Sequence, residues 1–216
     1  MRTDSQRARA SAKIPSQERG KLRVAALLDA AESVIAENGY EAATMTEIAA
    51  RAGASIGSLY QYFPTKTVVA DALRTRLRDA LCAELAALAT TAPGWTAAEL
   101  ARNLLATLPE FFRRRPAMLN IAEANRLPLP AAADVRHRLR KEVAAVLVAY
   151  APGIAVERAE TVSAVIYQLM KAATALADEP RLRHRESALA EMEALVAVYL
   201  ARLAVTKPSV RQVAKV

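Results

Sequence analysis

Apolar residues recur at helical spacing along most of the chain, in segments that proline, glycine or aspartate residues separate. Alanine, leucine, arginine and glutamate dominate these segments, and alternating runs typical of strands are absent from the sequence. The predicted fold class is therefore all-α. Beyond residue 66 the pattern predicts helices over residues 67–90, 97–114, 117–125, 132–150, 156–177 and 186–204.

The segment between Thr44 and Lys66 predicts two short helices. Thr44 and Glu47 have the spacing of a capping box, in which each side chain bonds the backbone N–H of the other residue. This motif starts a helix at Met45. Gly53 lies where a left-handed residue ends the helix and turns the chain.

The second of these helices is predicted from Ile56 to Phe63, capped by Ser55 and stopped by Pro64. Leu59 and Phe63 are one helical turn apart and share a face, so we expect both to be buried. Two short helices joined by a tight turn are typical of the helix-turn-helix. In that motif the second helix enters the major groove of DNA while the first crosses the backbone.

This stretch and the helix before it resemble the TetR/AcrR family of bacterial transcriptional regulators. The resemblance covers residues 20–73, and residues 74 onward carry no such match. It implies an N-terminal three-helix DNA-binding domain followed by a larger helical domain. The motifs in the family's order and spacing are Asn38-Gly39-Tyr40, the Thr44 cap, Ile48-Ala49, Ala52-Gly53, Gly57-Ser58-Leu59-Tyr60 and Phe63-Pro64-Thr65-Lys66.

The resemblance also implies how the parts of the chain divide and what they bind. It implies a homodimer whose two heads bind a palindromic operator in double-stranded DNA, and whose second domain holds a small-molecule inducer that abolishes DNA binding. The expected parts are a basic flexible arm (1–18), a helix-turn-helix DNA-binding domain (19–66), a helical ligand-binding and dimerisation domain (67–205) and a basic tail (206–216).

Carried over residue by residue, the resemblance implies phosphate contacts from Thr44, Ser55, Tyr60, Tyr62 and Lys66. It places Ile56, Ser58 and Gln61 on the groove-facing side of the second helix. Hydroxyl and ammonium groups at helix amino termini suit phosphate oxygens, and the Gln61 amide can pair with adenine. This helix has no arginine, lysine or asparagine. Contact of Ile56 with a thymine methyl, or readout of DNA shape, is therefore expected to carry more of the specificity.

Other interpretations of these residues remain open. Tyr60 can lie partly in the core with only its hydroxyl exposed, and Lys66 can be a solvated lysine in the first turn of the next helix. Gly39 and Gly53 are interpreted as structural, because their positions call for a backbone conformation rather than for chemistry.

The positive charge of the chain is concentrated at its start. The formal net charge is +8 and the pI is about 9.9, which favours a polyanionic partner. Residues 1–23 have seven basic residues against two acidic ones, a net charge of +5, whereas residues 24–66 have only Arg51 and Lys66 against five acidic ones, a net charge of −3. We expect the arm to supply much of the attraction to DNA. For residues 1–12 the alternative is a disordered basic tail that aids solubility.

The last two predicted helices have apolar residues over wide arcs, which also include Val165 and Leu195. Such breadth indicates burial on more than one side, against the chain's own domain and against a symmetry mate. In the resembled family the last two helices form a four-helix dimer interface; an ordinary central core is the alternative. The interface residues expected on this basis are Val162, Ile166, Leu169, Leu189, Met192, Val196 and Tyr199.

Candidate residues for an apolar ligand pocket are scattered through the second domain. Aromatic and methionine side chains can wall a cavity, and a few polar groups can orient a ligand in it. The candidate walls are Trp95, Phe111, Phe112, Met118 and Tyr167. The polar candidates are Glu123, Asn125, His137 and Gln168. Each of these residues can instead be an ordinary core or surface residue.

The sequence shows no nucleophile elbow, glycine-rich phosphate loop or metalloprotease motif, so we expect no enzyme. Its two histidines and single cysteine, Cys82, are dispersed, so no metal and no cofactor are expected. Without a long apolar run we expect no membrane partner and a cytoplasmic location. The expected function is a TetR-like one-component regulator, a repressor that a small apolar ligand releases from its operator. The alternative is a ligand-independent DNA-binding or architectural protein.

Overall fold

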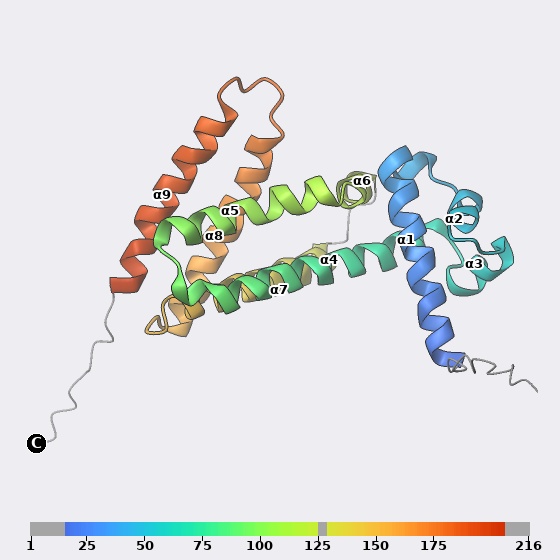
Figure 1. Ribbon diagram of the computed structural model, residues 1–216, viewed down its shortest axis with the longest axis horizontal. Helices are drawn as coiled ribbons and strands as arrows, with labels where there is room; N and C mark the ends of the chain where they lie inside the picture. Colours follow the sequence, from blue (N-terminus) through green and yellow to red (C-terminus); the bar gives the residue numbers. More distant parts are fainter. Residues whose placement is uncertain (1–15, 125–128, 206–216) are drawn as a thin grey trace, which may run out of the picture. The chain divides into compact units, whose positions relative to one another are not determined.

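The computed structural model describes residues 16–124 and 129–205, and the elements in these ranges are helices (Figure 1). The predicted all-α class is confirmed. No helix in the described ranges combines the length and the apolar character that crossing a membrane requires. The predicted basic tail and most of the predicted basic arm lie outside the described residues.

The chain forms two compact units, residues 1–73 and residues 74–216. The division falls inside one long helix, α4 (Lys66–Thr91), rather than in the loop before it. The first turns of α4 thus belong to the amino-terminal unit and the remaining turns to the second unit.

The first unit contains α1 (Ser16–Ala42), α2 (Met45–Arg51), α3 (Ile56–Tyr62) and the first turns of α4. Helices α2 and α3 have only seven residues each, too few to be stable alone in water. They are held by packing, because α2 contacts both α1 and α3. The fully buried side chains at the centre of this unit include Leu27, Ile35, Ile48, Leu59 and Leu73.

The predicted caps and turn are confirmed. The Thr44 hydroxyl and backbone N–H both donate to the Glu47 carboxylate, at 2.7 and 2.9 Å, and hold its pKa below the ordinary value. In return the Glu47 backbone N–H donates to Thr44 Oγ1 at 3.2 Å. Gly53 has a φ of 59°, a left-handed conformation that strains other residues. Ser55 Oγ accepts the backbone N–H of Ser58 at 3.1 Å and caps α3.

The second unit is built around α5. Its helices after α4 are η1 (Ala92–Gly94), α5 (Ala97–Arg114), α6 (Ala117–Ala124), α7 (Leu129–Tyr150), α8 (Val156–Ala177) and α9 (Arg185–Val205). Helix α5 packs on both α8 and α9, while α7 packs on α8. The inner stripe of α5 follows the helical period, with Leu100, Leu104, Leu108 and Phe111 buried.

The predicted limits of α5 and α8 agree with the structure. Helix α7 instead begins at Leu129, one turn before the predicted start, and includes Pro130 in its first turn. Proline is tolerated there because the first N–H groups of a helix have no acceptor within the helix. A proline that was interpreted as a break is therefore part of the helix start.

Candidate nucleic-acid interface

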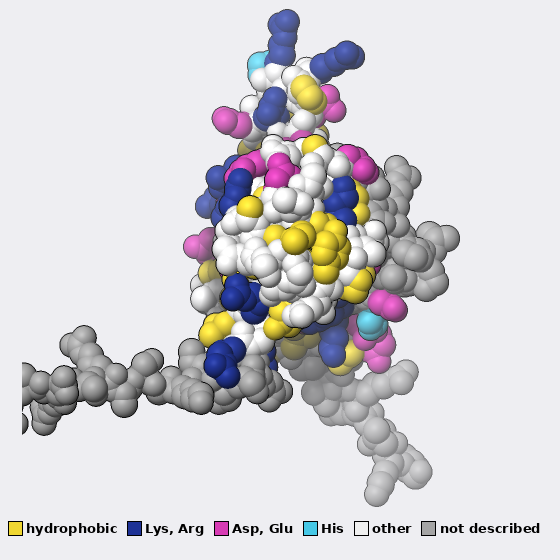
Figure 2. All heavy atoms as spheres, turned by 90° about the vertical axis from the view of Figure 1, so that its right-hand side faces the viewer, with side chains coloured by type: hydrophobic (Ala, Val, Ile, Leu, Met, Phe, Trp, Pro, Cys, Tyr) yellow, Lys and Arg dark blue, Asp and Glu magenta, His cyan; other side chains and the backbone are white. Residues whose placement is uncertain are grey.

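Helix α3 has two chemically different faces. Leu59 and Phe63 are buried, as predicted, and fix its inner face on the core. Ile56, Tyr60 and Tyr62 remain 40%, 49% and 40% exposed, although all three are large and mainly apolar. Figure 2 views the molecule from the side of α2 and α3 and shows hydrophobic side chains gathered at the centre of that face. A cluster of this kind marks an interaction surface.

Gln61 and Gly57 occupy the middle of the outer face of α3. At 3.6 residues per turn they project opposite to Leu59 and Phe63. The Gln61 side chain is exposed, and no atom lies within 4 Å of the place a Cβ of Gly57 would take. Another molecule can therefore approach the α3 backbone closely, beside an amide that both donates and accepts hydrogen bonds.

Tyr62 connects the end of α3 with the start of α1. A Cβ added at Gly20 would lie 3.8 Å from the Tyr62 hydroxyl oxygen, so the first turns of α1 pass beside this phenol. The same turns contain the exposed basic residues Arg19, Lys21 and Arg23. A cationic segment thus lies next to the uncharged face of α3.

Arg51 fastens α2 to α1. Its guanidinium donates to the Ser33 hydroxyl at 2.8 Å and to both carboxylate oxygens of Glu37, one of them at 2.7 Å. The bidentate bond lowers the pKa of Glu37 and raises the pKa of Arg51. An exposed pair contributes little energy by itself. Its two parallel bonds nevertheless fix the direction in which α2 leaves the turn.

Lys66 fastens the start of α4 to the end of α1. Its ammonium donates to the backbone carbonyls of Tyr40 at 3.0 Å and Glu41 at 2.9 Å, and lies 4.7 Å from the centroid of the Tyr40 ring. Both carbonyls follow Gly39, whose φ of 77° and ψ of 164° interrupt the helical conformation of α1, and the Lys66 ammonium supplies them with hydrogen-bond donors. Sequence reasoning missed this role because Lys66 lies far along the chain from Tyr40 and Glu41.

The two basic residues of the segment 24–66 therefore both bind groups inside the first unit. Lys66 has three N–H donors and uses two of them, so its contact with a DNA phosphate stays a prediction. Arg51 is committed to α1. The positive charge that the described residues place beside α3 comes instead from the start of α1.

Two other predicted phosphate contacts also cap helices. The Thr44 hydroxyl proton is used in the bond to Glu47. Ser55 Oγ only accepts a hydrogen bond, from the backbone N–H of Ser58, so its own proton is available to an outside acceptor. Ser58 is half-buried. The DNA contacts of these residues stay predictions, and Ser55 is better placed than Thr44 to donate to a phosphate.

The residues predicted for the dimer interface fall on two sides of α8 and α9. Val162, Ile166 and Val196 are buried in the chain's own core. The half-buried or exposed members of the set are Leu169, Leu189, Met192 and Tyr199. The apolar arcs predicted for α8 and α9 thus include residues that face the core of the second unit. Only the other residues of these arcs lie at the outer surface.

A shallow apolar groove of about 600 Å³ lies between α8 and α9. Val165, Leu169, Met192, Leu195 and Tyr199 are among the residues that line it. Leu195 is 73% exposed, which is exceptional for a leucine beside other apolar groups. Exposed apolar faces of this kind mark protein interaction sites.

The predicted ligand-pocket residues do not share one wall. Trp95 precedes α5 and Phe111 lies near its end, so about 20 Å of helix separates them. Phe111 is fully buried and makes an edge contact with Phe112, with ring centroids 6.0 Å apart. Tyr167 is buried, whereas the adjacent Gln168 is exposed.

The remaining ligand candidates divide in a similar way. Met118 is half-buried on α6, and His137 is exposed on α7, where it lines a groove beside α8. Glu123 and Asn125 lie outside the residues whose side chains the structure describes. Contact of these residues with a ligand stays a prediction.

Cys82 packs as a small apolar side chain. It is buried, and burial raises the pKa of its thiol. In the part of the chain that the structure describes, histidine, cysteine, aspartate and glutamate side chains form no cluster that could hold a metal ion.

The signature described as "Bacterial regulatory proteins, tetR family" matches residues 27–73. This stretch contains α2, α3 and the contacts of Arg51 and Lys66. The segment that forms most of the first unit thus matches the tetR family. A nucleoid occlusion factor, SlmA of Actinobacillus pleuropneumoniae, is 32% identical over 91 residues, which are 42% of this chain and 44% of SlmA. The similarity thus spans less than half the length of that relative.

Solved structures match the fold of both units of the chain. A tetR-family regulator of Pectobacterium atrosepticum has a TM-score of 0.63 and 21% identity, over 89% of this chain and 99% of that one. The repressor AlkX of a Dietzia strain has a TM-score of 0.56 and 18% identity, over 83% of this chain and 95% of that one. FadR of Bacillus subtilis has a TM-score of 0.54 and 18% identity, over 80% of this chain and 97% of that one. At such identities the likeness shows the fold alone.

The Glu37–Arg51 pair makes the stability of the amino-terminal unit depend on pH. Because the pKa of folded Glu37 is lowered, its contribution is present above the ordinary glutamate pKa of about 4.3 and is lost as pH falls through the folded value. We expect Glu37→Gln to lower the thermal midpoint at neutral pH and to flatten its decline in acid. Melting followed by circular dichroism measures both. Glu41→Gln controls for charge loss on α1, and an acid profile of Glu37→Gln equal to that of the wild type would contradict the pair's role.

Removing the Lys66 ammonium tests its two assignments separately. We expect Lys66→Ala to lower the thermal midpoint, because the carbonyls of Tyr40 and Glu41 lose their donor. If the third N–H binds a phosphate, the slope of log affinity against log salt also falls by about 1. Lys171→Ala, on α8, is the control. A lower midpoint with an unchanged slope would limit Lys66 to its structural role.

Proposed function

We propose that this protein is a one-component transcriptional repressor that binds a palindromic operator as a homodimer and is released by a small apolar ligand. The observation that carries the proposal is the exposed, uncharged face of α3 in a head whose own cations hold its helices together. Such a face fits the major groove, where amide, hydroxyl and apolar groups all find partners on base edges.

In this proposal the head binds DNA through two sets of residues. Contacts to phosphates position the head, and contacts to base edges specify the sequence. The phosphate contacts are Thr44, Ser55, Tyr60, Tyr62 and Lys66, and the base-facing residues are Ile56, Ser58 and Gln61. The basic start of α1 lies beside Tyr62, which supports attraction of a phosphate backbone to this side of the head.

The proposed dimer forms through the outer faces of α8 and α9. Val165, Leu169, Met192, Leu195 and Tyr199 provide an apolar surface that a second copy of the chain can cover. A twofold axis through this surface makes the interface self-complementary and matches the symmetry of a palindrome. The inward residues Val162, Ile166 and Val196 support this surface from the core.

Release by a ligand follows from linkage between two binding equilibria. A ligand that prefers the conformation with wrongly spaced heads lowers DNA affinity by the same coupling free energy, typically about 1–3 kcal/mol. Helix α4 passes from the first unit into the second and can transmit such a change. The structural relatives support an apolar ligand, since AlkX is implicated in biodegradation of n-alkanes and FadR was solved with stearoyl-CoA.

The similarity to SlmA favours a second candidate, a DNA-binding protein that organises DNA without a ligand. That relative is named for nucleoid occlusion rather than for transcription. In this case the second unit only dimerises. A saturable change of operator affinity on adding a small apolar compound distinguishes the repressor from this alternative.

Selection from a random pool of duplex DNA tests the proposed function. The purified protein is used at about 150 mM salt, where screening suppresses purely electrostatic binding. We expect enrichment of a palindrome, because a symmetric dimer presents two identical α3 faces. Recovery of no motif, together with binding that vanishes as salt rises, would contradict a sequence-specific regulator.

A charge in the α8–α9 groove should prevent dimerisation. Leu195 is 73% exposed, so Leu195→Asp leaves the core intact but places a carboxylate on the proposed interface. We expect a monomer in sedimentation and operator affinity at least about tenfold lower. Ser187→Asp adds the same charge at an exposed position of α9 away from the groove. A dimeric Leu195→Asp protein would contradict the proposed interface.

Replacing operator thymines by deoxyuridine tests the role of Ile56. The change removes only the 5-methyl group, and a buried methyl is worth about 0.8 kcal/mol, or about fourfold in affinity. We expect this loss at one position of each half-site for the wild-type protein and no loss for Ile56→Ala. Equal losses for both proteins would show that Ile56 does not contact the methyl.

A further inference from the structure

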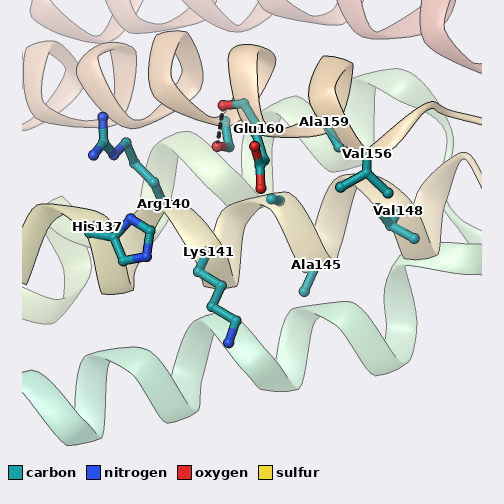
Figure 3. A pocket seen from close by; sticks show the side chains of 10 residues that line it. His137, Arg140, Lys141, Ala145, Val148, Val156, Ala159 and Glu160 are labelled. Atoms are coloured by element: carbon teal, nitrogen blue, oxygen red, sulfur yellow. Dashed lines mark hydrogen bonds between the residues drawn. The ribbon is translucent and has the colours of Figure 1, made fainter.

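Helices α7 and α8 enclose a groove that the proposed DNA-binding and dimer surfaces do not use (Figure 3). Its volume is about 540 Å³, within the range of roughly 300–1,000 Å³ that is typical of small-molecule sites. The lining residues recur at helical spacing on both helices, so two stripes of side chains face each other across it.

One end of the groove is cationic. His137, Arg140 and Lys141 line this end from α7; Figure 3 shows the Arg140 side chain pointing toward α8 and the Lys141 side chain pointing to the opposite side of α7. The neighbouring Arg138 is directed elsewhere, because its guanidinium donates to Asp79 of α4 at 2.7 Å. Arg140 and Lys141 are therefore the permanent charges that the groove offers to a ligand.

The other end of the groove is apolar. Val148 near the end of α7 and Val156 at the start of α8 lie together there, with Ala145 beside them (Figure 3). Val156 is 65% exposed, so apolar surface at this end faces water. Arg140 and Val148 are separated by about 12 Å along the axis of α7. Charge and apolar surface are thus arranged at opposite ends of one elongated groove.

Glu160 is the acidic residue of the lining, and it points into the groove from α8 between the two ends (Figure 3). Its carboxylate opposes part of the charge of Arg140 and Lys141. The two cations Arg140 and Lys141 against one carboxylate still leave this end of the groove positive.

We propose that this groove binds an amphipathic monoanion, a carboxylate with an unbranched alkyl chain of medium length. Arg140 offers a planar fork that suits a carboxylate, and Lys141 adds a second charge. The alkyl chain extends over Ala145 and covers Val148 and Val156, which removes their apolar surface from water.

The charge of the groove selects this class of ligand over two others. A purely apolar ligand would take water from the guanidinium of Arg140 and give it no acceptor in return. An amphipathic cation would be repelled by Arg140 and Lys141. The site includes neither Phe111 nor Tyr167, which are buried, and it opens on the outer surface of α7 and α8. Binding here requires neither DNA nor a dimer, so the proposal goes beyond the proposed function.

Titration calorimetry of the full chain without DNA tests the proposal. Octanoate, octanol and octylammonium share one chain and differ in the charge of the head group. We expect measurable binding of octanoate, weaker binding of octanol and the weakest binding of octylammonium. No binding of octanoate, or binding of octylammonium as tight as that of octanoate, would overturn the proposal whether or not the protein recognises an operator.

Four substitutions locate the bound octanoate. Arg140→Gln, Lys141→Gln and Val148→Asp should each weaken binding by about tenfold or more, since each removes a charge-assisted bond or places a like charge beside the chain. Glu160→Gln should tighten binding, because it removes a repelling carboxylate. These residues are exposed or half-buried, and circular dichroism verifies that the variants fold.

The matched control is Lys171→Gln. Lys171 is a cation of α8 outside the groove and hydrogen-bonds Gln168 at 3.3 Å. It should bind octanoate like the wild type. If the four groove variants also bound octanoate like the wild type, the ligand would lie elsewhere and the assignment of this groove would be wrong.

Discussion

The carbonyl groups at the end of α1 must find donors just where the chain turns into α2, and the head depends on how this constraint is met. Lys66 supplies two N–H groups from the first turn of α4, and its charge also lies close to the Tyr40 ring. Arg51 connects α2 to the same helix. Arg51 thereby holds the end of α2, Lys66 joins the helix after α3 to α1, and the buried core holds both seven-residue helices.

This use of cations determines how the head can recognise DNA. Arg51 and Lys66 are the basic residues of segment 24–66, and both are engaged inside the head. The outer face of α3 offers an amide, hydroxyls, apolar groups and the open backbone at Gly57. In the proposed function, specificity by contact and shape is thus separated from attraction by charge, which the residues before α2 would supply.

Local patterns in the sequence predicted the local structure well. The capping box of Thr44 and Glu47, the left-handed Gly53 and the buried pair Leu59 and Phe63 depend on neighbours within one or two helical turns. The limits of α5 and α8 follow from the same kind of signal.

Contacts between distant residues could not be predicted in this way. Nothing near Lys66 in the sequence indicates that the carbonyl of Tyr40 is its acceptor. The wide apolar arcs of α8 and α9 indicated two buried sides but not which residues face α5, so Val162 and Val196 were assigned to an outer surface although they are buried. Contact of the scattered pocket candidates with a ligand stays a prediction for the same reason, because helix packing decides which of them meet.

The salt dependence of operator binding, measured for the full chain and for a chain without residues 1–15, tests the central claim most directly. These residues carry four basic side chains against one acidic one. The account predicts that their removal lowers the slope of log affinity against log salt while the preferred sequence stays the same. An unchanged slope would contradict the role of residues 1–15, because the attraction would then have to come from the start of α1 or from the helix-turn-helix itself.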